Sequence, residues 1–187
     1  IPSEKIAYLD HHKSHAWSAF ACSPFDEALV FTFDGRGDLR SASVSYGSEK
    51  TGLDELGALL TIDSLGYLYG QITHHLGFTP HRHEGKITGL AARGNAEKTL
   101  PLFRKLFAWV EDGFQACVGP YEPFFDGIAP ELKALYDAHC REDLAAGVQA
   151  MTEELVTSYV AHWIKKVGKS GCKNICLAGG VAANVRV

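Results

Sequence analysis

The sequence lacks the features of membrane-inserted, exported and nucleic-acid-binding proteins. Its 187 residues contain no apolar run close to the roughly 18 residues of a membrane span, and residues 1–5 lack the basic and apolar regions of a secretory signal. No segment is strongly basic, and the formal net charge is -4. Membrane insertion, export and a nucleic-acid partner are therefore not expected.

The cysteines are few and follow no disulfide or metal-binding pattern. Five are scattered along a chain that is 46% hydrophobic and long enough to bury a core without disulfides. A reducing cytoplasm is the expected location. Cys172 and Cys176 lie four residues apart, but no second pair accompanies them, so we expect buried or half-exposed thiols rather than a zinc site.

The order of the predicted elements indicates an α/β fold. In chain order, hydrophobic periodicity and turn residues predict a strand at 5–9, a helix at 11–21, hairpin strands at 28–33 and 41–46 around a turn at 34–38, helices at 64–76 and 84–92, an irregular stretch with a short hairpin at 110–126, a helix at 142–167, a strand at 174–178, and a last helix opened by Gly179 and Gly180. The chain has no start methionine and both ends are abrupt, so we expect a piece of a longer protein.

The helix predicted at residues 142–167 has the clearest periodicity. Apolar residues recur along it at steps of three and four, which predicts one buried face. That face contains Leu144, Met151, Leu155 and Trp163. We expect it to pack against the strand at 174–178.

Two histidines of the helix predicted at 11–21 are placed to share a metal ion. His11 and His15 are four residues apart, so their side chains leave one face of a helix about one turn apart. Neutral imidazoles bind iron, zinc and related divalent ions, and two such ligands leave positions for a carboxylate, water or substrate. The alternative is a polar helix start with solvated or hydrogen-bonded histidines.

The turn at residues 34–38 has the sequence DGRGD and lies between two apolar strands. Gly35 and Gly37 allow positive φ and the close approach of a second backbone or an anion. The backbone N–H groups of such a turn can hold phosphate oxygens, and the carboxylates of Asp34 and Asp38 can hold a cation or water. Asp-Gly is equally common in hairpin turns that have no such role.

Two further segments are candidates for ligand binding. Residues 81–86 place Arg82 and Lys86 beside a helix start, where an anion can bind, although a solvated loop is the commoner case. At residues 176–184 a strand ends in Gly179 and Gly180 and small residues follow, so a base or ribose can lie against the backbone. Close helix packing explains the same glycines equally well.

Together these segments resemble one protein family. The sequences HHKSHAWSAF, DGRGD, LGYLYGQIT followed by LGF, EGKITGLA and LAGGV are similar, in that order, to the O-carbamoyltransferases of nodulation-factor and antibiotic biosynthesis. Their blocks lie at residues 11–20, 34–38, 65–78, 84–91 and 177–181. Five blocks in one order, spread over nearly the whole chain, are more specific than any one of them.

The resemblance implies part of an actin-like, ribonuclease-H-like ATPase fold, because the family's domain is similar to the universal tRNA-threonylcarbamoylation protein. Residues 1–25 are expected to end the first lobe, and residues 26–187 to form mainly the second lobe with a helical insertion at about 54–140. A first phosphate-binding strand, a later metal-binding aspartate and an adenylate-forming domain are missing from the chain. The isolated chain is therefore expected to be inactive.

The implied activity is transfer of a carbamoyl group from carbamoyl phosphate, through a carbamoyl-adenylate made with ATP, to a hydroxyl of a small molecule. By the same resemblance, a divalent metal, iron or zinc, binds His11 and His15. The candidate catalytic residues are Asp34, Asp38 and Lys86, and the candidate nucleotide-binding residues are Gly35, Gly37, Gly179, Gly180 and Asn184. The expected partners are these substrates and the adenylate-forming domain of the parent chain, and a homo-oligomer is left open.

Two alternatives stay open. The pattern His-x-x-x-His and the segment Gly-Gly-Val-Ala-Ala-Asn also suit a protein of tRNA threonylcarbamoylation, although the acidic balance disfavours a tRNA partner. A non-catalytic nucleotide-binding or assembly module would bind ATP without carbamoyl transfer.

Overall fold

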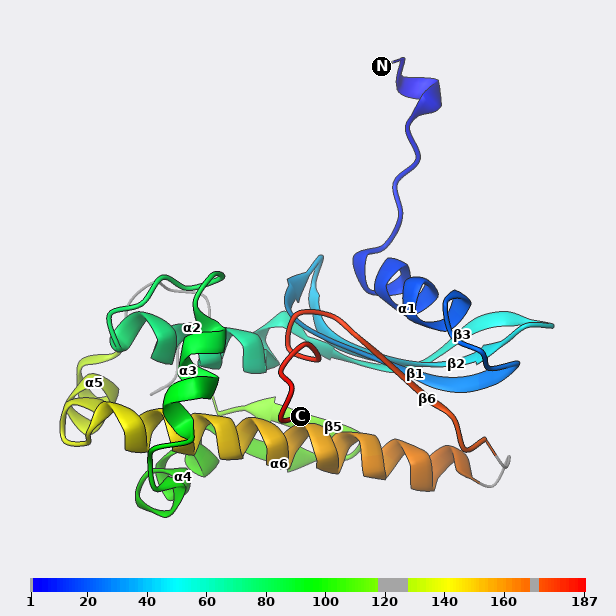
Figure 1. Cartoon of the computed structure of the whole chain (residues 1–187). Coiled ribbons are helices and arrows are strands. Elements are labelled where there is room, and N and C mark those ends of the chain that lie inside the picture. Colours follow the sequence, from blue (N-terminus) through cyan, green and yellow to red (C-terminus); the bar gives the residue numbers. More distant parts are fainter. Residues whose placement is uncertain (1, 118–127, 169–171) are drawn as a thin grey trace.

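A four-stranded mixed sheet forms the centre of the fold (Figure 1). The computed structural model describes residues 2–117, 128–168 and 172–187. The strands of this sheet are β1 (Glu27–Gly37), β2 (Arg40–Ser48), β3 (Gly52–Leu60) and β6 (Ile175–Ala178). The first three form an antiparallel meander, and β6 pairs in parallel with β1, which gives the order β3-β2-β1-β6. The fold is therefore mixed α/β.

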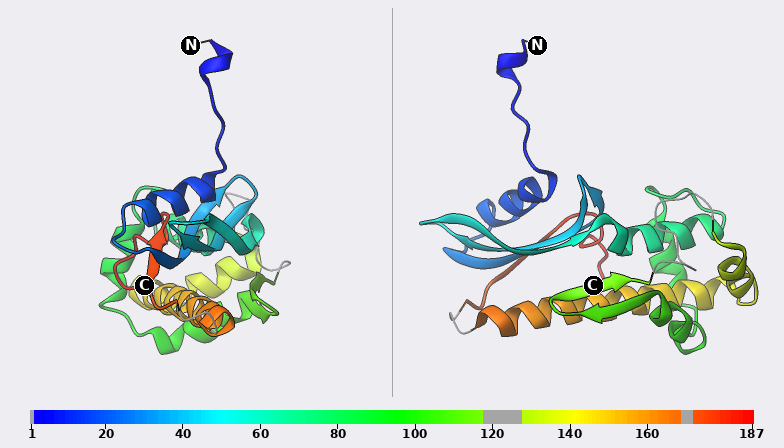
Figure 2. Two further views of the ribbon diagram at one scale, coloured as in Figure 1. Left: turned by 90° about the vertical axis from the view of Figure 1, so that its right-hand side faces the viewer. Right: turned by 180° about the vertical axis from the view of Figure 1, so that it is seen from behind.

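The other elements lie on the two faces and at one end of the sheet, except η1, which projects away from it with the N-terminal segment (Figure 1). They are η1 (Ser3–Lys5), α1 (His11–Ala21), η2 (Thr61–Asp63), α2 (Leu65–His75), α3 (Glu84–Ala91), η3 (Ala96–Lys98), α4 (Leu100–Phe103), η4 (Arg104–Leu106), β4 (Phe107–Val110), β5 (Gly113–Ala116), α5 (Pro130–Asp137) and α6 (Arg141–Val167). Figure 2 shows α1 on one side of the sheet and α6 with the β4–β5 hairpin on the other. Within the described ranges, no helix combines the length and the apolar character that a bilayer crossing requires.

Strand β1 is buried on both faces, and its side chains alternate between two apolar clusters. Leu29, Phe31 and Phe33 belong to the larger cluster, which includes the buried side of α6. Ala28 and Val30 point the other way, into a smaller cluster with Ala16, Phe20 and Cys176. This period of two is the ordinary alternation of a strand, and it places Thr32 on the same face as Ala28 and Val30, toward α1.

The helix predicted at residues 142–167 is present as α6 and has the predicted buried face, but that face does not pack against the predicted strand. Tyr159 on that face makes edge-on ring contacts with Phe31, Phe33 and Phe114. The helix packs mainly against α2, α3, α4, η3 and β5. Cys176, the buried residue of β6, faces α1 instead. The expectation that α6 packs against residues 174–178 was therefore wrong, because β1 and the hairpin lie over the helix.

Several predicted elements are confirmed to within about four residues. They are the helices at 11–21, 64–76, 84–92 and 142–167, the strands at 28–33 and 41–46, and the strand at 174–178. Part of the stretch at 110–126 forms the predicted short hairpin, β4–β5, and its residues 118–126 lie outside the described part of the chain. Residues 52–60, at the start of the region expected to be a helical insertion, form β3, a strand that the sequence pattern did not indicate.

Two predicted elements are wrong. Residues 5–9 form no strand, because no described strand pairs with them, and Tyr8 is 91% exposed. The helix expected after Gly179 is replaced by turns. Gly179 has φ of +97°, which a right-handed helix cannot include, and the Val181 N–H donates to the Phe33 carbonyl at 3.0 Å. Because of this bond, the segment after Gly179 crosses the end of β1.

Leu155 on α6 tests the packing of this face. Its side chain is 9% exposed, so Leu155→Ala is expected to lower the free energy of unfolding by about 2–5 kcal/mol. Ile164→Ala on the same helix, at a position 37% exposed, is the matched control and is expected to cost much less. Urea unfolding of the two variants measures the difference. Equal losses would contradict the burial described for α6.

Candidate metal centre and adjoining cavity

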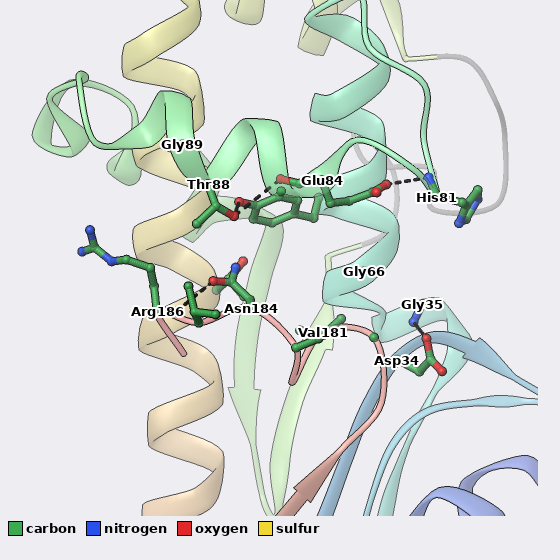
Figure 3. Close-up of a pocket in the computed structure, with 16 residues that line it drawn as sticks. Asp34, Gly35, Gly66, His81, Glu84, Thr88, Gly89, Val181, Asn184 and Arg186 are labelled. Atoms are coloured by element: carbon green, nitrogen blue, oxygen red, sulfur yellow. Dashed lines mark hydrogen bonds between the residues drawn. The ribbon is translucent and has the colours of Figure 1, made fainter.

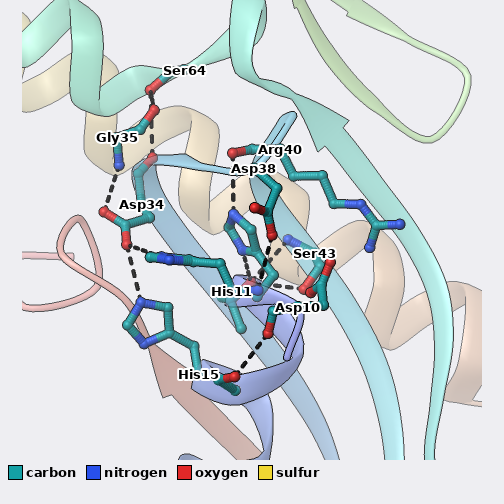
Figure 4. Close-up of polar contacts among 12 residues, drawn as sticks. Asp10, His11, His15, Asp34, Gly35, Asp38, Arg40, Ser43 and Ser64 are labelled. Carbon is teal, nitrogen blue, oxygen red and sulfur yellow. Dashed lines mark hydrogen bonds and ion pairs between the residues drawn. The ribbon is translucent and has the colours of Figure 1, made fainter. Parts of the chain in front are cut away.

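Two histidines of α1 and one aspartate of β1 bring their ligand atoms together (Figure 4). Helix α1 begins at His11 because the Asp10 carboxylate accepts the Lys13 N–H at 2.7 Å, as an N-cap residue does. The imidazoles of His11 and His15 then lie one turn apart and face the end of β1. Their Nε2 atoms lie 3.0 and 3.1 Å from Oδ2 of Asp34. The spacing of the two histidines therefore predicted their proximity correctly.

The Asp34 carboxylate is ionised in this position. Burial acts to raise the pKa of Asp34, but the bonds from His11, from the Gly35 N–H and from His15 outweigh it, and the pKa is lowered. The Gly35 N–H donates to Oδ1 at 2.7 Å, which leaves Oδ2 directed to the histidines. An ionised carboxylate oriented by a backbone donor is the form that binds a cation.

The same Asp34 lines a cavity of about 680 Å³, the size of a small-molecule site (Figure 3). Its walls come from the end of β1, the helices α2, α3 and α6, and the turn after β6. Much of the wall is glycine, at Gly35, Gly66, Gly85, Gly89 and Gly180, while the polar side chains are those of Asp34, Tyr69, His81, Glu84, Thr88, Thr152, Asn184 and Arg186. A flat ligand can therefore approach backbone over a large part of the surface.

A hydrogen-bonded group supports one wall of this cavity. The Tyr69 hydroxyl donates to Gln149 Oε1 at 2.7 Å, and Asn184 Nδ2 donates to the same oxygen at 2.9 Å. Thr88 Oγ1 lies 2.9 Å from the Tyr69 hydroxyl oxygen. Because the Tyr69 proton is already donated to Gln149, the Thr88 hydroxyl is the donor in this bond. Burial raises the pKa of Tyr69 to about 12, so its hydroxyl stays protonated and remains a donor. These bonds tie α2, α3, α6 and the C-terminal turn together.

Comparison with known proteins places the chain in a family. The sequence profile described as carbamoyltransferase N-terminus matches residues 1–187. This chain belongs to the carbamoyltransferase family. The resemblance inferred from the five sequence blocks is thereby confirmed.

Curated relatives of this carbamoyltransferase domain include nodulation proteins. Nodulation protein NolNO of Sinorhizobium fredii is 32% identical, over 98% of this chain and 27% of its own length. Nodulation protein NolO of Bradyrhizobium diazoefficiens is 32% identical, over 94% of this chain and 32% of its own length. Nodulation protein U of Sinorhizobium fredii is 24% identical, over 94% of this chain and 35% of its own length. The chain thus spans about a quarter to a third of these relatives.

The donor set of the carbamoyltransferase domain fits a divalent metal. Two imidazole nitrogens and one carboxylate oxygen lie within 4.8 Å of one another, and this set is typical of zinc and of non-haem iron with open positions for further ligands. Neither Cys172, which is half-buried, nor Cys176, which is buried, joins a metal-binding group in the described part of the chain. All five cysteines lie in described residues and are free thiols.

The remaining residues of the 34–38 turn have structural contacts with α1. Asp38 Oδ2 accepts the His11 N–H at 3.1 Å, so this carboxylate helps to cap the helix. Gly37 packs against the His11 ring, because a Cβ on this residue would lie 2.1 Å from Cδ2. Gly35 and Gly37 allow a positive φ, but the positive φ of the hairpin turn lies at Asp38, at 55°. Strand β1 continues to Gly37 after a shift in its register with β2, so the turn comes later in the chain than these glycines.

The other predicted site residues divide into two groups. Gly180 and Asn184 line the cavity. Gly179 does not, since a Cβ there would lie 2.2 Å from the Phe33 carbonyl oxygen, under the end of β1. Lys86 is also absent from the cavity wall, because its Nζ lies over the Phe78 ring, 5.4 Å from its centre.

Sequence reasoning missed His12, the histidine between the two candidate ligands. It is 1% exposed, its Nδ1 lies 2.6 Å from Thr32 Oγ1, and its Nε2 lies 3.2 Å from the Arg40 carbonyl oxygen. Burial lowers the pKa of His12, although the bond to the Arg40 carbonyl acts in the opposite direction. The available signal was its spacing of four and eight residues from Ala16 and Phe20, the other buried residues of α1.

Proposed function

We propose that the full-length protein containing this domain transfers a carbamoyl group from carbamoyl phosphate, through a carbamoyl-adenylate made with ATP, to a hydroxyl of a small molecule. One observation carries the proposal: Asp34 both meets the two histidines and lines the cavity. A metal-binding group and a ligand site that share a side chain suit a reaction at a polarised carbonyl.

The proposal assigns a divalent metal, iron or zinc, to His11, His15 and Asp34. Such a metal supplies Lewis acidity, which draws electron density from a carbonyl oxygen. The chain's own residues orient the reactants: the small residues of the cavity wall admit the adenylate, and Gly35, Gly180 and Asn184 stand where it would lie. Of the three predicted catalytic residues only Asp34 lines the cavity, and catalytic roles for Asp38 and Lys86 stay predictions.

The proposed transfer forms one bond and breaks another. The acceptor hydroxyl oxygen bonds to the carbamoyl carbon, and the bond from that carbon to the AMP phosphate oxygen breaks. AMP leaves with the electron pair of that bond, and the hydroxyl proton is released. Positioning the acceptor beside the adenylate makes the step effectively unimolecular.

The proposed fold is the second lobe of an actin-like ATPase. The antiparallel meander, extended in parallel by β6 beside β1, supports this, as does the glycine-containing turn after β6 that crosses the end of β1. The nucleotide would then lie at the ends of β1 and β6. A further domain of the full-length protein is proposed to form the adenylate, and free cysteines support a cytoplasmic location.

Product analysis of the full-length protein tests this function. With carbon-13-labelled carbamoyl phosphate, ATP, Fe²⁺ or Zn²⁺ and a panel of small molecules that bear hydroxyls, we expect label in a carbamate ester and release of AMP. Omission of ATP is the control and is expected to abolish the labelled product. ATP binding without any transfer of label across the panel would favour a non-catalytic module.

The isolated chain of 187 residues is expected to be inactive under the same conditions. The proposed cleft needs groups from the rest of the protein, and without them water competes for each contact. Positioning, worth about 7–11 kcal/mol in well-oriented reactions, is then largely lost. A side-by-side assay measures turnover by both forms. A rate for the isolated chain close to that of the full-length protein would contradict the expectation.

A further inference from the structure

A polar contact between α1 and the sheet lies beside the candidate metal centre. The buried residues of α1 are His12, Ala16 and Phe20, at steps of four, and they form the stripe that faces the sheet. Ala16 and Phe20 pack among apolar residues, whereas His12 meets Thr32, the polar residue on the α1 face of β1. His12 is therefore the only member of the stripe with directional contacts.

The hydrogen bonds of His12 specify its tautomer. The Arg40 carbonyl can only accept, so the proton of the neutral ring lies on Nε2, 3.2 Å away. Nδ1 must then accept, and its partner at 2.6 Å is the Thr32 hydroxyl, which donates its proton to the ring.

The chain of bonds continues into β2. Thr32 Oγ1 accepts the Ser43 N–H at 3.1 Å and lies 2.7 Å from Ser43 Oγ, which donates to it (Figure 4). Thr32 and Ser43 are paired across the β1–β2 register. A buried network in which each member has its hydrogen-bond partners is rigid. The His12 ring bonds to Thr32 of β1 and to the Arg40 carbonyl of β2, so both strands hold it in place.

The rotation of α1 about its own axis decides where the two candidate ligands point. Side-chain atoms lie about 5–6 Å from a helix axis, so a rotation of about 20° displaces an imidazole nitrogen by about 2 Å. A metal site tolerates only about 0.2 Å in its ligand distances. The apolar contacts of Ala16 and Phe20 have no preferred direction, and the bond from the His11 N–H to Asp38 lies at the exposed start of the helix.

We propose that His12 is a positioning residue, whose bonds to Thr32 and the Arg40 carbonyl fix the rotation of α1 and so hold His11 and His15 against Asp34. This inference rests on the metal centre of the proposed function. His12 supplies no atom to the group formed by His11, His15 and Asp34, and it does not line the cavity. Its ring lies 5.4 Å from that of His11 and 6.5 Å from that of His15, and its hydrogen bonds go to the sheet instead.

The test is Co²⁺ binding by the full-length protein, measured as a dissociation constant and as the visible absorption spectrum of the bound ion. Thr32→Val removes the hydroxyl and keeps the shape of the side chain. We expect it to weaken Co²⁺ binding about tenfold, the lower end of the effect of losing a supporting hydrogen bond, and to alter the spectrum. Thr32→Ser keeps the hydroxyl and is expected to bind Co²⁺ as the unaltered protein does.

Two further variants separate positioning from general stability. His12→Phe preserves the ring size and removes both hydrogen bonds, so it is expected to behave as Thr32→Val does. Phe20→Leu removes packing from the same stripe and is expected to lower the melting temperature while leaving Co²⁺ affinity unchanged.

The outcomes are distinct. Unchanged Co²⁺ affinity and spectrum in Thr32→Val, or in His12→Phe if Thr32→Val does not fold, would overturn the positioning role. Absence of Co²⁺ binding in the unaltered protein would overturn the metal centre and the positioning role together. Co²⁺ binding that responds to Thr32→Val, in a protein that transfers no carbamoyl group, would overturn the proposed reaction alone.

Discussion

His15→Ala in the full-length protein is expected to lose the divalent metal and, with it, carbamoyl transfer. His15 supplies one of the three convergent donors, and His11 and Asp34 alone leave a site with two protein ligands. Lewis acidity lowers a barrier by several kcal/mol, so we expect turnover to fall by roughly 1,000-fold. Elemental analysis of the purified protein, together with the rate of product formation, measures both effects.

His74→Ala is the matched control for this loss. His74 is an exposed histidine on helix α2 and belongs to no group of metal ligands in the described ranges. It is expected to leave metal content and turnover unchanged. Equal metal content in His15→Ala and the unaltered protein would remove the candidate centre.

Gly179→Ala and Gly180→Ala are expected to fail in different ways, although the two residues are neighbours. A side chain at Gly179 must adopt φ of +97° and would meet the backbone of Phe33, so we expect a loss of about 2–5 kcal/mol in the free energy of unfolding. Thermal or urea unfolding of the variant measures the loss.

Gly180→Ala is expected to leave stability nearly unchanged and to disturb the site. Its Cβ would lie 3.1 Å from Oδ1 of Asp34, which can move by a few tenths of an ångström. The carboxylate is then reoriented, and metal affinity and turnover should fall. Gly168→Ala, at the C-terminal end of α6 with no heavy atom near the added Cβ, is the control for both variants. If Gly179→Ala unfolds like this control, the close approach to Phe33 is not a constraint.

Local patterns predicted the elements whose formation depends on their own residues. The stripe of α6 and the start of α1 after Asp10 are both set within a few turns of chain, and both were found where expected. Strand β3 was missed because residues 52–60 alternate poorly and include two glycines, and the strand forms by pairing with β2. Residues 5–9 have a strand-like sequence, but a strand also needs a neighbour.

The part of the candidate site that depends on local spacing was predictable from the sequence, and the part that depends on how the elements pack was not. The four-residue step from His11 to His15 is a local property, and it predicted two convergent imidazoles. Asp34 was predicted as a cation-binding carboxylate only as part of the 34–38 turn. Its position between the histidines and the cavity depends on how α1 lies on β1. The partnership of His12 with Thr32 joins residues twenty apart, and a single sequence without its fold carries no sign of it.

If a metal and a cavity ligand both bind as proposed, the Asp34 carboxylate would couple the two binding events, because its two oxygens face different sites. Oδ2 faces the imidazoles, while Oδ1 bonds to the Gly35 N–H and lies beside Gly180 at the wall of the cavity. A cavity ligand that shifts this carboxylate changes the metal affinity by some factor, and thermodynamic reciprocity requires the metal to change the ligand's affinity by the same factor. Neither dissociation constant is then a property of one site, because each depends on the concentration of the other partner.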